Sequence, residues 1–333
     1  MRFIVLMLCC WPLLGFSAPD EKPIVVTSAS MIADMASKIA GEHLTVECLV
    51  PIGGDPHLHE ATPSDARQVV AANLLLLNGL TFDGWLNELI DNSGSKATVV
   101  TVTEGMEPIS SAEGKNSVDP HAWMNVQMAM IYIRNIKNAF QELLPSQKDA
   151  FEANYQKYKG ELEALDREIE ASIASIPEKK RVLITSHDAF QYYGRRYGIA
   201  LEPFMGTSTD AEAQTSDIVR LNKVIVENDL PAVFVESTVN PKLLEQLASD
   251  NDIVVGGELY ADSIGDEDSP APTYADMMRH NTRTIVEALK REKSEITEAE
   301  LTEGEGGTNW MLYGLMGLIL LAGFIFVARK MKV

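Results

Sequence analysis

The sequence has little cysteine and a marked shortage of positive charge. Of its three cysteines, Cys9 and Cys10 lie in an apolar leader and do not follow the small residues of a bacterial lipid-attachment site. The remaining one, Cys48, excludes a disulfide framework and a cysteine-rich metal site, and its strand-like surroundings predict a small buried core residue. Lysine and arginine number 28 against 48 acidic residues, giving a formal net charge of −20. That excess argues against nucleic acid as a partner.

Long apolar runs are confined to the two ends of the chain. Residues 1–18 join Arg2 to a short apolar run and then to small residues, which predicts a secretory signal peptide. Residues 310–328 carry no charge, and their length is close to that of a membrane-spanning helix. The basic tail at 329–333 indicates a cytoplasmic end. After an acidic, glycine-containing stalk at 293–309, we expect a C-terminal transmembrane helix that anchors an extracytoplasmic or periplasmic body to the cytoplasmic membrane.

Between these ends, short β-rich runs alternate with helical ones, a pattern typical of parallel sheets flanked by helices. In the first half we expect strands at 24–27, 46–50, 74–77 and 97–102, and helices at 30–40, 63–72 and 124–140. In the second half we expect strands at 181–185, 200–203, 232–235 and 253–255, and helices at 188–197, 215–228, 241–249 and 273–289. The prediction is an α/β protein with two lobes, 24–144 and 180–292, each with a parallel sheet.

A long helix is predicted between the two lobes. Apolar residues recur at steps of three and four through residues 146–176, namely Phe151, Tyr155, Tyr158, Leu162, Leu165, Ile169 and Ile173. This spacing places them in one stripe on a helix. We expect this helix to pack along both lobes as a stiff backbone; a coiled-coil dimer is the alternative.

Two tripeptides stand out among only six histidines: Asp55-Pro56-His57 and Asp119-Pro120-His121. Proline fixes its own φ and moves the residue before it out of the helical region. Each tripeptide precedes a helix-like run, so each is expected to place an imidazole at the opening of a helix. The duplication suggests two halves of one metal site.

Two further candidates follow predicted strands of the second lobe, where parallel sheets bind their ligands. His187 comes directly after the strand at 181–185, and Asp262 follows the strand at 253–255 after a short loop. Three imidazoles and one carboxylate suit Zn²⁺, or Mn²⁺ with added carboxylate coordination. From the residues alone, Asp266 and Asp268 compete with Asp262. His59 is a further possible ligand, and Asp55 and Glu60 are possible partners that orient an imidazole.

Four motifs in order resemble the signatures of the TroA/ZnuA-like family, the periplasmic zinc and manganese solute-binding proteins of ATP-driven importers. They are Gly54-Asp55-Pro56-His57 with Pro63-Ser64-Asp65, Asp119-Pro120-His121-Ala122-Trp123, Ser186-His187-Asp188-Ala189-Phe190-Gln191-Tyr192-Tyr193, and Leu259-Tyr260-Ala261-Asp262-Ser263-Ile264-Gly265. The similarity runs from about Ile24 to Leu289. It implies two α/β lobes joined by one long helix, with a metal ion between them held by His57, His121, His187 and Asp262.

The resemblance also implies a role and a partner. The protein is expected to be a monomeric, non-enzymatic receptor that delivers a divalent metal to a membrane permease, with the C-terminal span as its tether. His187 at the third position resembles zinc binders and mixed zinc/manganese binders, whereas a glutamate there would resemble the manganese and iron group. The histidine-rich loop of many zinc-specific members is missing, since residues 109–118 contain no histidine. Zinc is favoured, with manganese or iron as the alternative.

Two other classes of function compete with the receptor. A metallohydrolase would need an open metal position for water, whereas four protein ligands close a tetrahedral site; Glu236 and Glu258 are its candidate bases. A surface adhesion or interaction protein that is stiffened by metal is the other alternative.

Overall fold

The computed structural model describes residues 22–111, 118–209 and 214–293. In the first half, β1 (Ile24–Thr27), β2 (Thr45–Cys48), β3 (Leu74–Leu77) and β4 (Thr98–Thr101) form a parallel sheet in the order β2-β1-β3-β4. The central strand β3 is four consecutive leucines, all buried, as expected for a parallel strand covered on both faces. Its helices are α1 (Ser30–Ala40), α2 (Pro63–Ala71), α3 (Gly84–Ser93) and α4 (Val126–Leu143), with short 3₁₀ turns at Ala122–Met124 and Pro145–Gln147.

The second half of the chain contains two small parallel sheets, not the single sheet that the sequence predicts. One pairs β5 (Val182–Leu183) with β6 (Ala200–Leu201), and the other pairs β7 (Ala232–Glu236) with β8 (Val254–Leu259). The Phe234 amide donates to the Ile184 carbonyl over 2.9 Å, so β7 lies beside the chain that leaves β5. The helices are α6 (Gln191–Tyr197), α7 (Thr215–Asn228), α8 (Lys242–Asp250) and α9 (Tyr274–Leu289), after a 3₁₀ turn at Glu178–Lys180.

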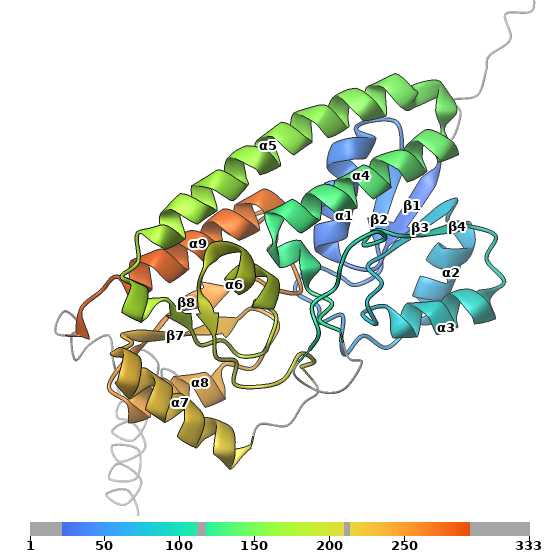
Figure 1. The fold of residues 1–333 in the computed structure, drawn as a ribbon. Helices are drawn as coiled ribbons and strands as arrows, with labels where there is room; N and C mark the ends of the chain where they lie inside the picture. The colour runs from blue at the N-terminus through green and yellow to red at the C-terminus, as the bar shows by residue number, and fades with distance from the viewer. Residues whose placement is uncertain (1–21, 112–117, 210–213, 294–333) are drawn as a thin grey trace, which may run out of the picture.

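The long helix α5 (Lys148–Ala174) lies within the predicted range and passes along both halves of the chain (Figure 1). It contacts α1 and α4 of the first half and α6 and α9 of the second. The predicted stripe is confirmed, since Phe151, Tyr158, Leu162, Leu165, Ile169 and Ile173 are buried and Tyr155 is half-buried. Hydrophobic burial along the whole stripe therefore stabilises α5 against both halves.

The hydrophobic core is continuous between the two halves. Its largest cluster includes Met31 and Phe140 from the first half and Tyr193 from the second. Two buried hydrogen bonds reinforce it: the Trp123 indole donates to the Ala261 carbonyl over 2.9 Å, and the Tyr274 hydroxyl donates to the Trp123 carbonyl over 2.6 Å. Separating the halves as rigid bodies would expose this packing, which favours small movements over a wide hinge.

One local prediction from the sequence is wrong, and one helix is missing from the prediction. Cys48 is half-buried instead of buried, because it ends the edge strand β2, and its thiol donates to the Val50 carbonyl over 3.1 Å. Helix α3 was not predicted, and Leu86 is its one fully buried residue. A helix that buries so little leaves a weak apolar pattern in the sequence.

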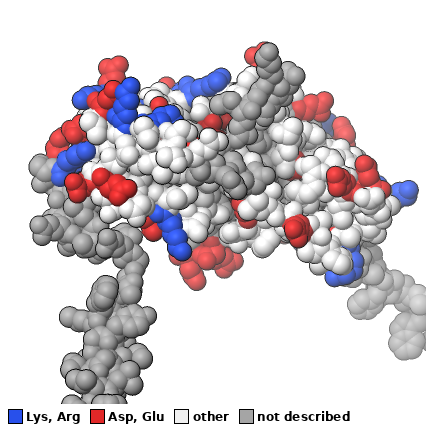
Figure 2. All heavy atoms as spheres, turned by 90° about the horizontal axis from the view of Figure 1, so that it is seen from below, with Lys and Arg blue, Asp and Glu red and all other residues white. Residues whose placement is uncertain are grey.

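The structure describes the charged surface of the body but not the predicted membrane segments. Figure 2 shows acidic side chains scattered over one face and interspersed with Lys and Arg, as is usual for a solvated surface. Within the described ranges, no helix combines the length and apolar content that a membrane crossing needs. The predicted signal peptide at 1–18, nearly all of the stalk at 293–309, the span at 310–328 and the tail at 329–333 lie outside the described residues.

Candidate metal centre

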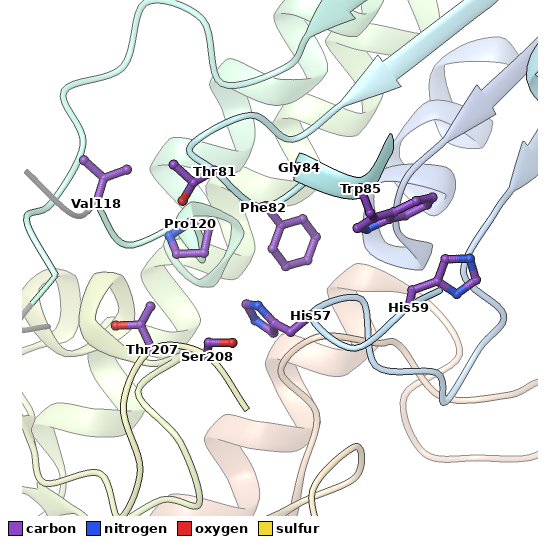
Figure 3. A pocket seen from close by; sticks show the side chains of 10 residues that line it. All are labelled: His57, His59, Thr81, Phe82, Gly84, Trp85, Val118, Pro120, Thr207 and Ser208. Carbon is purple, nitrogen blue, oxygen red and sulfur yellow. The ribbon is translucent and has the colours of Figure 1, made fainter. Parts of the chain in front are cut away.

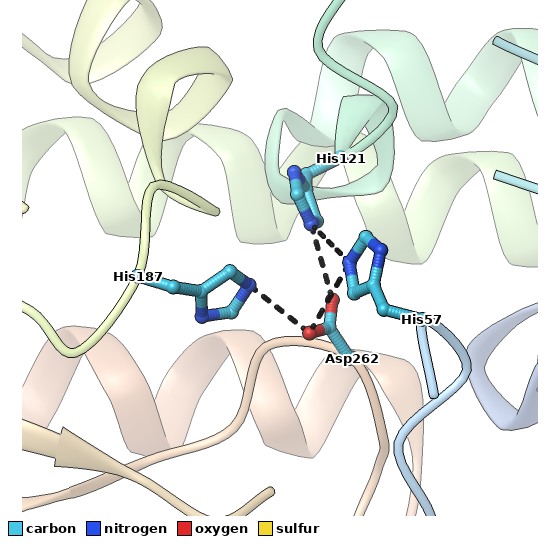
Figure 4. Close-up of side chains that lie close together, drawn as sticks. All are labelled: His57, His121, His187 and Asp262. Carbon is cyan, nitrogen blue, oxygen red and sulfur yellow. Dashed lines mark hydrogen bonds and ion pairs between the residues drawn. The ribbon is translucent and has the colours of Figure 1, made fainter. Parts of the chain in front are cut away.

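Four side chains from separate loops converge between the two halves: His57, His121, His187 and Asp262 (Figure 4). His57 lies between β2 and α2, His121 directly precedes the 3₁₀ turn at Ala122–Met124, His187 lies between β5 and α6, and Asp262 follows β8. His121 therefore opens a helical turn as predicted. The same prediction is wrong for His57, because α2 begins only at Pro63 and the imidazole sits in the preceding loop.

Four distances between these groups are close to the spacing of ligands around one ion. The Nε2 atoms of His57 and His121 are 3.2 Å apart. Asp262 Oδ1 lies 3.3 Å from His121 Nε2, and Asp262 Oδ2 lies 3.0 Å from His187 Nε2 and 3.7 Å from His57 Nε2. Tetrahedral zinc with bonds of 2.0–2.1 Å separates neighbouring ligand atoms by about 3.3 Å. The cluster can therefore accept a divalent cation with little rearrangement.

The four side chains are buried or nearly buried, and a bound cation would supply partners for their polar atoms. The side chains of His121, His187 and Asp262 are fully buried, and that of His57 is 9 % exposed. Neither oxygen of Asp262 and neither ring nitrogen of His187 has a hydrogen bond of good geometry. Buried polar atoms without partners are costly, and a metal ion bound to His187 Nε2 and one Asp262 oxygen would satisfy two of these four atoms at once.

Two further carboxylates orient the imidazoles from behind. Asp119 Oδ1 lies 2.7 Å from His121 Nδ1, and Glu236 Oε2 lies 2.7 Å from His187 Nδ1. Both rings thereby direct Nε2 towards Asp262, an arrangement common behind metal-bound histidines. The sequence prediction missed both roles. Asp119 was visible inside the duplicated tripeptide, and Glu236 as a carboxylate that ends a buried strand.

The duplicated tripeptides fold alike. Asp55 Oδ1 accepts a hydrogen bond from the His57 amide over 2.8 Å, and Asp119 Oδ1 accepts one from the His121 amide over 2.9 Å. An aspartate that bonds the backbone two residues ahead forms an Asx turn, and the intervening proline stiffens it. The Asp-Pro-His sequence therefore fixes the backbone conformation of the histidine.

The other candidates from the sequence lie outside the cluster. His59 Nε2 lies 3.1 Å from Asp65 Oδ2, and Asp65 closes the capping box at the start of α2. Glu60, Asp266 and Asp268 are exposed. The structure therefore brings together the four residues that the family resemblance selects and none of their rivals.

Burial and charged neighbours shift the pKa values of the three imidazoles in different directions. Burial alone would lower the pKa of His121, but the carboxylates of Asp262 and Asp119 raise it to about 9. Burial is likewise outweighed at His187, where Glu236 and Asp262 raise the pKa well above its ordinary value. Burial lowers the pKa of His57. Although burial opposes it, the two neighbouring imidazoles hold the pKa of Asp262 well below its ordinary value. The site attracts positive charge, either as protons or as metal.

A pocket of about 300 Å³ opens beside His57 (Figure 3). Its lining includes His59, Phe82 and Trp85, and the Phe82 ring meets the His57 ring edge-on with centroids 5.2 Å apart. His57 is also the most exposed of the four groups. The side of the cluster nearest to solvent is therefore the His57 side.

Comparisons with known proteins all match metal-binding proteins. Residues 25–288 match the family model described as ZnuA, zinc-uptake complex component A, periplasmic. The chain is 35 % identical over 279 residues to the manganese-binding lipoprotein MntA of Bacillus subtilis, covering 81 % of this chain and 91 % of that protein. It is 36 % identical over 282 residues to the zinc-binding protein TroA of Treponema pallidum, covering 83 % and 91 %.

Solved structures agree. The structure of the periplasmic zinc-binding protein TroA from Treponema pallidum superimposes with a TM-score of 0.77 at 35 % identity, covering 81 % of this chain and all of that one. A manganese-bound periplasmic metal-binding protein from Candidatus Liberibacter asiaticus gives a TM-score of 0.74 at 30 % identity, covering 80 % of this chain and all of that one. These relatives are named for both zinc and manganese, so they do not select one ion. The chain belongs to the ZnuA/TroA family of metal-binding receptors, the non-enzymatic substrate-binding proteins of ABC metal transporters.

Proposed function

We propose that this receptor captures one divalent metal ion outside the cytoplasm with His57, His121, His187 and Asp262 and delivers it to the permease of its importer. The observation that carries the proposal is the buried cluster, in which one potential ligand atom from each residue lies within 4.8 Å of all the others. Three imidazoles and one carboxylate form the donor set, and all four protein ligands together leave no open position for a hydrolytic water in a tetrahedral site.

Zinc is the metal that we favour, with manganese as the alternative. A nitrogen-rich donor set suits zinc, and the Irving–Williams order gives zinc the higher affinity at equal availability. Asp262 presents Oδ1 to His121 and Oδ2 to His187. If both oxygens coordinate, the site gains a fifth donor, and added carboxylate coordination is what manganese prefers.

The architecture proposed for this role has two lobes and a tether. The lobes are 24–144 and 180–292, the linking helix is 146–176, and the metal lies between the lobes. The support is the contact of α5 with helices from both halves and the origin of the ligands, two from each half. The protein acts as a monomer, and the C-terminal span at 310–328 holds it near the permease.

Metal competition tests the choice of ion. Metal-free protein offered equal free concentrations of Zn²⁺, Mn²⁺ and Fe²⁺ is expected to retain one zinc per chain, measured by elemental analysis after gel filtration. His59→Ala is the matched control, since His59 pairs with Asp65 outside the cluster, and it should retain the same zinc. Retention of manganese against equal free zinc would show that site geometry overrides intrinsic affinity, and would make the importer a manganese importer.

A further inference from the structure

The loop that carries His57 has little packing of its own. Of residues 51–62, only Pro56 is buried, and the Ile52 and Leu58 side chains are 51 % and 55 % exposed. Hollows flank the loop: the pocket beside His57, and a second pocket of about 470 Å³ lined by Asp55, Leu58 and Thr209. A segment with few buried apolar contacts opens at low free-energy cost. Its position therefore depends on a small number of polar contacts.

The turn that carries His121 is held quite differently. The Asn78 side-chain amide donates to the Pro120 carbonyl over 3.0 Å, and the Tyr192 hydroxyl donates to the Asp119 carbonyl over 3.2 Å. Both bonds are buried, and Asp119 and His121 are themselves buried. The two tripeptides thus share an Asx turn, but one is fixed in the core and the other projects from it.

The aspartates of the two tripeptides also use their carboxylate oxygens differently. Asp119 uses Oδ1 for both the amide and the ring of its own histidine. Asp55 instead uses its second oxygen, Oδ2, to accept a hydrogen bond over 2.6 Å from the Thr209 hydroxyl, which belongs to the other lobe. One carboxylate therefore joins the backbone of His57 to the other lobe. The Gly53 amide adds a second cross-lobe bond, to Ser263 Oγ over 2.8 Å.

We infer that Asp55 and Thr209 form a latch that holds the His57 loop closed over the metal and sets the rate at which metal leaves. The inference rests on the proposed function of the four-residue site and adds two positioning residues that do not touch the ion. His57 is the least buried of the four ligands and lies next to the pocket. The core is continuous between the lobes. Swinging this loop away therefore opens the site while disturbing less packing than a separation of the lobes.

Thr209→Val tests the latch, because valine keeps the shape of threonine and removes the hydroxyl donor. The full-length protein is loaded with zinc and mixed with excess chelator, and zinc loss is followed with time. Hydrogen bonds to charged groups are among the stronger ones in proteins. We expect zinc to dissociate about tenfold faster from Thr209→Val, while Thr209→Ser, which retains the hydroxyl, stays within twofold of the wild type.

Ser111→Ala is the matched control. Ser111 Oγ and Thr207 Oγ1 form another hydroxyl contact between the lobes, at 2.7 Å, that does not involve the His57 loop, so this variant should release zinc at the wild-type rate. Equal dissociation from Thr209→Val and the wild type would overturn the latch and leave the metal site intact. A wild-type protein that retains no zinc would overturn the proposed function instead, so the two failures are distinguishable.

Discussion

Replacing Asp262 by alanine is expected to lower the affinity for zinc by at least a hundredfold. Asp262 is the one carboxylate of the cluster, and its oxygens lie 3.0–3.7 Å from Nε2 of all three imidazoles. Loss of a group that only orients a ligand typically costs 10–100-fold in metal affinity. Loss of the charged ligand itself should cost at least the upper end of that range. Competition with a chelator of known affinity measures the change.

Two matched variants test whether the effect comes from the charge of Asp262, from its shape, or from any carboxylate in this loop. Asp262→Asn keeps the size of the side chain without its charge, and we expect it to bind zinc weakly as well. Asp268→Ala removes an exposed carboxylate from the same loop and should bind like the wild type. Full zinc affinity in Asp262→Ala would remove this residue from the site and return Asp266 and Asp268 to consideration.

Zinc affinity is expected to fall at least a hundredfold between pH 8 and pH 6. Imidazoles must be neutral to coordinate a metal, and the pKa of His121 in the metal-free site is raised to about 9. The neutral fraction of that ring drops from roughly one-tenth at pH 8 to roughly one-thousandth at pH 6. Protons at His187, whose pKa is also raised, add to the loss.

The sign follows from competition, because a raised pKa means that protons occupy the site more tightly and metal must displace them. An ordinary imidazole would place the whole effect near pH 6.5, whereas this site should already lose affinity below pH 9. Calorimetric titration at several pH values, in buffers of different ionisation enthalpy, measures both the affinity and the protons released. An affinity that stays constant from pH 8 to pH 6 would contradict coordination by His121.

Much of the site could be predicted from sequence because its ligands stand in short, stereotyped turns. The proline and aspartate around His57 and His121 fix local backbone geometry, so the residues that aim the ligands are adjacent in the chain. Glu236 was harder to assign, because it reaches His187 from a strand about fifty residues away. Thr209 had no local signal at all, since its contact with Asp55 exists only after the two halves have packed.

In the fold, too, features that depend on a local sequence pattern were predictable, and features that depend on distant contacts were not. Helix α5 was predictable from its long apolar stripe, and β3 from its four leucines. The division of the second sheet into two pairs was not, because it depends on where the chain turns away from its neighbours. β5 pairs with β6 only at Val182 and Leu183, and the backbone then leaves the sheet and carries His187.

The most direct test of the central claim is an anomalous difference map from crystals of the zinc-loaded protein, recorded at the zinc absorption edge. We predict one strong peak per chain, at about 2.0–2.1 Å from Nε2 of His57, His121 and His187 and at a similar distance from the carboxylate of Asp262. A peak at any other position, or a cluster without a peak in a crystal that contains zinc, would contradict it.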